Sequence, residues 1–376
     1  MPTVGPEPTT DMTNKMITLA LGLLFLGGLG LIFSGQINLE NRSVAAVGSI
    51  FSPDTPLRVG VILPLTGDFS SFGTEVRRGV ELGVDAAVKN GYHIDAIYED
   101  AKSDFGAGPL SATHKVLTVD DADIGLTMVT EQAKPIIPVF DQHKIPLLVV
   151  WDSNKALTEA GVSVFSSGFS TEGAGEQMAE YAYSELGLRR IAILQHKDAW
   201  AEVIAPAFAQ KFQSLGGTIV LDEKVDLSVT DYRTIIARIK QTNADGTYFP
   251  LIPPTNAQFI IQARQYSLPG ALLTADAFQL DVIRQLGDVG NGIYYTNIHT
   301  NMADELARLY QAKFGEEAHD VAFVSMGYDG IAKIIEAANI RESLMEGMLE
   351  VFGPSRSADK IEKVFKIVEG KPVEVE

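Results

Sequence analysis

Strand-like apolar runs alternate with amphipathic helices along most of this chain, from residue 57 onward. The runs at 58–63, 145–150 and 191–194 are each followed by a segment with apolar residues at helical spacing. This alternation predicts βαβ units, in which parallel sheets carry helices on both faces. Since a chain of 376 residues has room for two domains, we expect an α/β fold with two doubly wound parallel-sheet lobes.

The segment 57–100 indicates where such a fold would bind a ligand. It contains a buried strand at 58–63, a loop rich in Pro, Gly and Ser, a helix from about 73 to 89 and a second strand. The loop follows the carboxyl end of its strand, which is where open α/β folds bind small molecules. A unit of similar build begins at Arg190, and each unit has an aromatic residue, Phe72 or Trp200, where the loop turns into the helix.

Composition excludes several classes of function. The formal charge of −18 leaves no basic stripe for nucleic acid. The absence of cysteine excludes disulfides, thiol nucleophiles and Cys-based zinc sites. The six histidines are dispersed without ligand spacing and are expected mostly at the surface, and no P-loop, GxSxG or HExxH motif is present. We therefore expect no enzyme activity, no catalytic residues, no cofactor and no metal.

An apolar, uncharged run at 16–33 precedes the folded part. Its length lies between the core of a long signal peptide and a short membrane span, so residues 1–33 are interpreted as a signal peptide or a membrane anchor. Residues 34–56 are polar for most of their length and are interpreted as a linker. Either alternative places the remainder outside the cytoplasm, in the periplasm or on the outer cell surface.

Several motifs together resemble one known family. They include VGVILPLTGDFSSFG at 59–73, YEDAKSDFGAG at 98–108 and SMGYDGIAKIIEAA at 325–338. Their order is similar to that of the type I periplasmic solute-binding proteins, specifically the leucine/isoleucine/valine-binding receptors of ABC importers. The resemblance covers the chain from about residue 57 to its end.

This resemblance implies a Venus-flytrap arrangement that traps a small solute between two lobes and delivers it to ABC transporter permease subunits. The chain would cross between lobes near Gly168, Asn297 and Phe352. The first lobe would then contain 57–167 plus 298–352, and the second 168–297 plus 353–376. A surface sensory or signalling protein with the same fold, binding a solute other than an amino acid, is the alternative.

The resemblance also implies ligand-binding residues, each with a structural alternative. Phe72 would line the cleft of the first lobe, or pack inward as a hydrophobic staple. Trp200 would close over the ligand from the second lobe, or pack on the following helix. Thr130 and Ser153 would hold a carboxylate, or serve as helix caps.

Asp276 matches the carboxylate that binds the α-amino group in amino-acid receptors. Its alternative is a capping box with Gln279. The chain departs from the family pattern at Glu131, at Trp151 on the pocket floor and at 252–253. These changes make the expected pocket bulkier, more apolar and more acidic. The resemblance implies an amino acid or a related solute, but the changes argue against a leucine-type ligand and leave an aromatic, amide-like or cationic solute as the alternative.

Overall fold

The computed structural model describes residues 55–376 except 105, 154, 279, 299, 358–361 and 376. The proposed signal peptide or anchor, and the linker up to residue 54, lie outside the described residues. Within the described part, the helices fall short of the length or apolarity that a membrane crossing requires.

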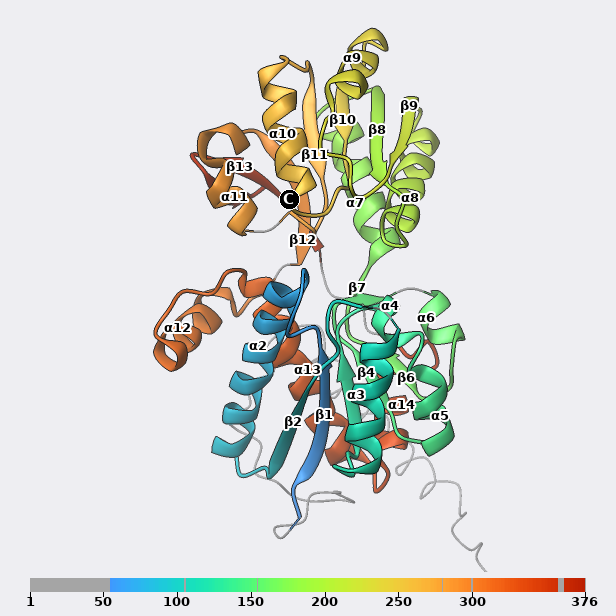
Figure 1. Ribbon diagram of the computed structural model, residues 1–376, viewed down its shortest axis with the longest axis vertical. Helices are drawn as coiled ribbons and strands as arrows, with labels where there is room; N and C mark the ends of the chain where they lie inside the picture. Colours follow the sequence, from blue (N-terminus) through green and yellow to red (C-terminus); the bar gives the residue numbers. More distant parts are fainter. Residues whose placement is uncertain are drawn as a thin grey trace, which may run out of the picture. The chain divides into compact units, whose positions relative to one another are not determined.

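The first lobe is built on a parallel five-stranded sheet of order β2-β1-β3-β4-β6 (Figure 1). Strands β1, β3, β4 and β6 are buried on both faces, as expected of a parallel sheet, whereas the edge strand β2 is only partly buried. The strands are β1 (Leu57–Leu63), β2 (Ile94–Asp100), β3 (Ile124–Thr127), β4 (Leu147–Val149) and β6 (Val164–Ser166).

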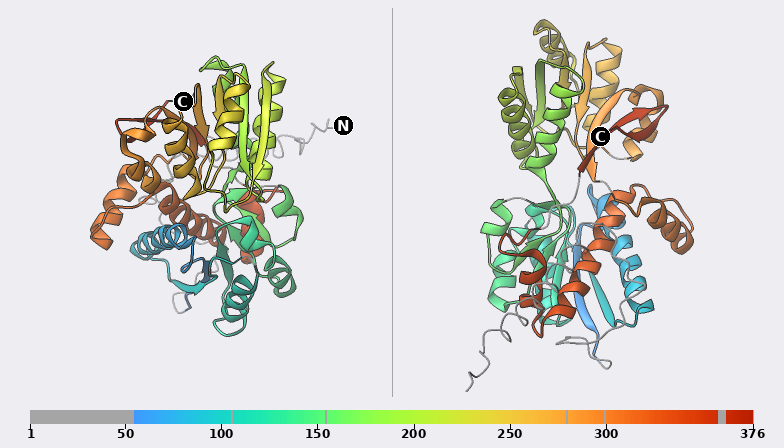
Figure 2. Two further views of the ribbon diagram at one scale, coloured as in Figure 1. Left: turned by 45° about the horizontal axis from the view of Figure 1, so that its top comes forward. Right: turned by 180° about the vertical axis from the view of Figure 1, so that it is seen from behind.

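Helices cover both faces of this sheet. On one face α2, α13 and α14 form a core with alternate residues of β1, and on the other α3, α5 and α6 form a second core. The views from front and back both place α13 beside α2 (Figures 1 and 2). The helices are α2 (Ser70–Lys89), α3 (Ala107–Thr118), α4 (Thr130–Ala133), α5 (Ile137–His143), α6 (Lys155–Glu159), α12 (Ala303–Phe314), α13 (Val321–Ile340) and α14 (Leu344–Phe352).

The second lobe is built on a seven-stranded sheet of order β14-β13-β12-β11-β10-β8-β9. Strands β8 to β12 pair in parallel, whereas β13 and β14 form an antiparallel hairpin on the edge. The two turn residues, Glu369 and Gly370, both have positive φ, as tight hairpin turns require. The strands are β8 (Arg190–His196), β9 (Thr218–Val225), β10 (Gly246–Tyr248), β11 (Ala271–Thr274), β12 (Ile293–Ile298), β13 (Glu362–Val368) and β14 (Lys371–Glu374).

This sheet also has two cores. One involves α7 and α8, and the other α9, α10 and α11. A short pair, β5 (Asp152–Ser153) with β7 (Phe169–Ser170), lies apart from both large sheets. The helices are α7 (Thr171–Ser184), α8 (Ala201–Ser214), α9 (Arg233–Gln241), α10 (Thr255–Gln265), α11 (Leu280–Leu286) and the 3-10 helix η2 (Gly287–Gly290).

The predicted α/β class with two doubly wound lobes is confirmed. The boundaries differ in detail: α2 begins at Ser70 rather than near residue 73. Helix α13 and the antiparallel hairpin were not expected as elements.

Candidate functional site

An aromatic cluster forms where three segments of the first lobe meet. Phe72 lies in the first turn of α2, Trp151 follows β4 and Phe323 lies in the first turn of α13. The Phe72 and Trp151 rings stack with centroids 5.1 Å apart, and Phe323 packs edge-on at 5.1 Å from Phe72 and 4.7 Å from Trp151. None of the three is more than 9% exposed. The cluster is therefore an apolar wall that excludes water.

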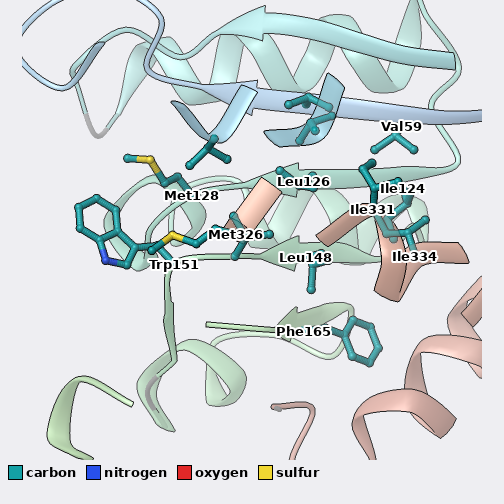
Figure 3. Packing of buried hydrophobic residues seen from close by; sticks show 14 of the residues in the cluster. Val59, Ile124, Leu126, Met128, Leu148, Trp151, Phe165, Met326, Ile331 and Ile334 are labelled. Atoms are coloured by element: carbon teal, nitrogen blue, oxygen red, sulfur yellow. The ribbon is translucent and has the colours of Figure 1, made fainter. Parts of the chain in front are cut away.

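The cluster is the end of the first-lobe core on the side of the α2 and α13 N-termini. Trp151 lies at one end of the packed residues in Figure 3, next to Met128. The backbone N–H of Trp151 donates to the carbonyl of Met128, so the segments that follow β3 and β4 run side by side. Phe72 thus packs inward on other aromatic residues, and its role in lining a ligand cleft stays a prediction.

Asp276 brings the second lobe to this cluster. It follows β11 and is only 3% exposed. Trp151 Nε1 donates a hydrogen bond of 3.1 Å to Asp276 Oδ2, which links the two lobes. Among the described residues, Oδ1 of the same carboxyl has no hydrogen-bond partner.

The electrostatic state of Asp276 follows from this burial. Loss of solvent raises the pKa of Asp276 to about 7, and the hydrogen bond from Trp151 offsets only part of that effect. A buried carboxyl with one unused oxygen gains most from a cationic donor, because the charge pair compensates for the lost hydration. The alternative role in a capping box involves Gln279, which is outside the described residues.

Trp200 contacts the same carboxyl from the second lobe. It is the N-cap residue of α8 and packs against Ala174, Ile204 and Ala275. Its indole lowers the pKa of Asp276, although Nε1 has no well-aligned hydrogen bond in the part of the chain described. Both tryptophans of the chain are therefore at one buried carboxyl.

The two residues expected to hold a carboxylate lie at the ends of neighbouring segments. Thr130 is buried in the first position of α4, and the N-cap of that helix is Val129 rather than Thr130. Ser153 is in β5, where its backbone pairs with Ser170, but its side chain is outside the described residues. The structure thus brings together Phe72, Trp151, Trp200 and Asp276, and gives no position for the Ser153 hydroxyl.

Sequence reasoning missed Phe323 and misjudged one histidine. Phe323 was missed because 321–340 was not expected as a helix, although small and apolar residues recur there at helical spacing. His196 was grouped with the surface histidines but is fully buried, and burial lowers its pKa to about 4. Its Nδ1 accepts a 3.3 Å hydrogen bond from the backbone N–H of Ile252, so it braces the turn after β10 as a neutral ring.

The described residues contain no group of three acidic or histidine side chains placed to hold a metal ion. The site therefore offers an apolar wall, indole N–H groups and one buried carboxyl. This combination suits binding of a small molecule and includes no arranged nucleophile and base.

Comparisons with known proteins agree with the two-lobed fold. A Leu/Ile/Val-binding protein homolog from Brucella abortus is 23% identical over 312 residues, covering 79% of this chain and 81% of that protein. The substrate binding protein LivJ of Streptococcus pneumoniae, solved with isoleucine, has a TM-score of 0.76 at 18% identity, with 85% and 100% of the chains covered. A solute binding protein of Rhodopseudomonas palustris, solved with 3,4-dihydroxybenzoic acid, has a TM-score of 0.74 at 19% identity, with 85% and 96% covered.

These relatives are solute-binding proteins rather than enzymes, the last of them from an ABC transporter, and the family functions outside the cytoplasm. The family model described as periplasmic binding protein matches residues 56–347, which is most of the chain. The resemblance to the leucine/isoleucine/valine-binding group is thereby confirmed, and the chain belongs to the periplasmic binding protein family.

Proposed function

We propose that this chain is the receptor of an ABC importer and traps a small amino-acid-like solute at Asp276. The observation that carries this proposal is the unused Oδ1 of that buried carboxyl, beside the Trp151 hydrogen bond to Oδ2. An α-ammonium group would donate to Oδ1 and neutralise the charge. The bound ammonium group then stabilises the charged form of Asp276, because its hydrogen bond and charge compensate for the water that burial removed.

The side chain of the solute would lie against the aromatic residues. Phe72, Trp151 and Phe323 supply flat apolar surfaces on the first-lobe side, and Trp200 faces the carboxyl from the second lobe. Aromatic faces also attract cations, so they favour an ammonium group near Asp276. Thr130 and Ser153 are proposed as partners of the solute carboxylate at the carboxyl ends of neighbouring strands.

The structural neighbours suggest two classes of solute, amino acids and benzoates, and Asp276 should interact differently with each. The Streptococcus pneumoniae protein is bound to isoleucine and the Rhodopseudomonas palustris protein to a dihydroxybenzoic acid. A benzoate carboxylate would be repelled by the charged form of Asp276 and would need the proton that Asp276 loses above its pKa of about 7, whereas an ammonium group stabilises the carboxylate itself. An amino acid brings a cation to the same place, so it is the class we propose.

Trapping would use hinge motion between the lobes, with chain crossings near Gly168, Asn297 and Phe352. The division of the chain at those crossings, and the delivery of the solute to permease subunits, are parts of the same proposal. The N-terminal segment would export the chain and, if retained, anchor it to the membrane.

The proposal is tested by titrating the full chain in mild detergent with amino acids and hydroxybenzoates while recording tryptophan emission. Both tryptophans lie at Asp276, so binding there should change the emission. We expect a response to an α-amino acid, and a loss of affinity of about tenfold or more in D276N.

D95N is the matched control because Asp95 is exposed on β2, and it should bind as the wild type does. A response to hydroxybenzoate alone, unchanged in D276N, would contradict the role of Asp276. Single-tryptophan variants W151F and W200F would assign the change in emission to one lobe.

A further inference from the structure

A small recess adjoins the Phe72 and Phe323 rings, which also pack on Trp151, the hydrogen-bond partner of Asp276. It is lined by these two rings and by Glu75, Asp281, His319 and Asp320. Asp281 belongs to α11 of the second lobe, whereas the others belong to the first lobe. The recess is therefore formed by residues of both lobes, as is the contact at Asp276.

Glu75 is the buried acid of this recess. It is 2% exposed, and within the described residues its Oε2 has no hydrogen-bond partner. Its Oε1 accepts a hydrogen bond of 2.7 Å from the Tyr310 hydroxyl and lies 3.6 Å from Arg78. Arg78 is shared, because it also forms an ion pair of 2.6 Å with Glu316. Burial raises the pKa of Glu75 although Tyr310, Arg78 and the ring and backbone N–H of His319 all act to lower it, so the charge of Glu75 is only partly compensated.

Asp320 and Asp281 add negative charge around the same space. Asp320 is 7% exposed and uses Oδ1 to cap α13 through the Ala322 N–H at 2.9 Å. Burial raises the pKa of Asp320 to about 6 and also raises the pKa of Glu75. Asp281 pairs with His319 at 2.9 Å, which ties α11 to the residue before the α13 cap.

The size and walls of the recess restrict its occupant. It has room for about one water-sized group, which matches a primary ammonium head and excludes a guanidinium fork. The described residues show no set of side chains placed to coordinate a metal. The two aromatic rings favour a cation on an apolar stem over a hydrated inorganic ion.

We propose that this recess binds the second, primary ammonium group of the solute, with Glu75 Oε2 as its acceptor. The solute is then a diamino acid, whose α-ammonium group binds Asp276 and whose aliphatic stem passes along Phe72 and Phe323. This inference rests on the proposed function for its first ammonium contact. It further specifies the solute as a diamino acid, because a monoamino acid would leave Glu75 Oε2 without a partner.

The test compares pairs of ligands that differ only in the terminal ammonium group. L-lysine and L-norleucine are titrated by calorimetry into the full chain in mild detergent, together with 1,5-diaminopentane. In the wild type, lysine should bind about tenfold or more tightly than norleucine, since the analogue leaves a buried acceptor unpaired. In E75Q that preference should disappear while the affinity for norleucine is kept.

Glu81 provides the matched control, because it lies on the same helix but outside the recess and pairs with Arg77. E81Q should keep the preference for lysine. D320N keeps a good capping residue, so it should fold and should weaken the preference in the same direction as E75Q.

The outcomes separate the two proposals. Equal affinity for lysine and norleucine, both lost in D276N, would overturn the recess proposal and leave the proposed function intact. Binding of 1,5-diaminopentane without any amino acid would support the recess and overturn the amino-acid reading. No binding of any of the three would overturn the recess proposal, whereas the proposed function is decided by the titration with other α-amino acids. The titrations are repeated in buffers whose salt is either sodium chloride or choline chloride. If the solute binds only in the sodium buffer and lysine is not preferred, the recess holds an inorganic cation and the proposal is overturned.

Discussion

At the scale of single residues, the charge of Asp276 favours binding of a cationic group but lowers the stability of the ligand-free fold. Asp276 contributes a carboxyl that burial forces toward its neutral form, with a pKa of about 7 in the fold and an ordinary value of 3.8. A core without ligand would be more stable with an uncharged group there. The chain keeps the carboxyl, which is expected where a residue is retained for binding rather than for stability.

Replacing Asp276 with Asn should stabilise the ligand-free chain at high pH. A carboxyl with a raised pKa keeps its proton in the fold while the unfolded chain loses it, so wild-type stability falls as pH rises from about 4 to about 7. Asparagine does not titrate and can still accept the Trp151 hydrogen bond. The melting temperature of D276N should exceed that of the wild type by several degrees at pH 8 and by almost nothing at pH 4.

Thermal unfolding at both pH values, with D95N beside it, measures this difference. The Asp95 side chain is exposed to solvent, so D95N should have the same melting temperature as the wild type at each pH. A D276N variant that is less stable than the wild type at pH 8 would show that the carboxylate is satisfied in the fold, in contradiction to the unused Oδ1.

At the scale of elements, the helix pair α2 and α13 positions most of the first-lobe site. Helix α2 carries Phe72 and Glu75, and α13 begins at the Asp320 cap and carries Phe323. The helices approach closely at Gly327, where a Cβ atom would lie 2.0 Å from the carbonyl oxygen of Val76. Backbone cannot yield as a flexible side chain can, so this position requires glycine.

The variant G327A should therefore push the two helices apart. We expect a loss of about 1–3 kcal/mol in the free energy of unfolding, as for other overpacked cores, together with weaker solute binding. Gly290 is the control, since a Cβ there meets only ordinary contacts of 3.4 Å or more. Chemical denaturation of G327A and G290A measures the change in stability and titration with the solute measures the change in binding, and equal stability of the two variants would refute the role of the close contact.

The same elements show what the sequence can and cannot predict. The strand at 57–63 and the helix after it were predictable, because apolar residues alternate clearly with polar ones in that helix. Helix α13 is buried along most of its length, so its polar face is too narrow to produce that signal. The Phe323 contact was missed for this reason.

Contacts between the lobes could not be predicted from the sequence for a different reason. Trp151 and Asp276 are 125 positions apart and meet only because each follows a strand of a different sheet. The resemblance to the family suggested that both belong to one pocket, but not that the indole donates to the carboxyl. The recess at Glu75 was not expected either, since Glu75 and Asp281 lie in different lobes and are far apart in the sequence, and only the folded chain places both in its lining.

At the scale of the whole molecule, the two lobes have separate cores, so a solute that contacts both should change their relative position. The absence of cysteine makes this measurable, because introduced cysteines are the sole sites for thiol-reactive spin labels. Val88 on α2 and Ile261 on α10 are exposed and belong to different lobes. For the pair V88C and I261C, adding saturating solute should narrow the distribution of label distances and shift its mean.

The pair V88C and V119C is the control, since both positions are exposed in the first lobe and their separation should not change. Introducing D276N into the V88C and I261C background should shift the response to solute concentrations about tenfold or more higher, because the solute would lose its charge partner in the second lobe. A distance distribution that stays the same with saturating solute, although the tryptophan emission reports binding, would rule out closure. The chain would then bind its solute in one fixed arrangement, and a transporter would have to recognise the loaded receptor by the solute itself rather than by the position of the lobes.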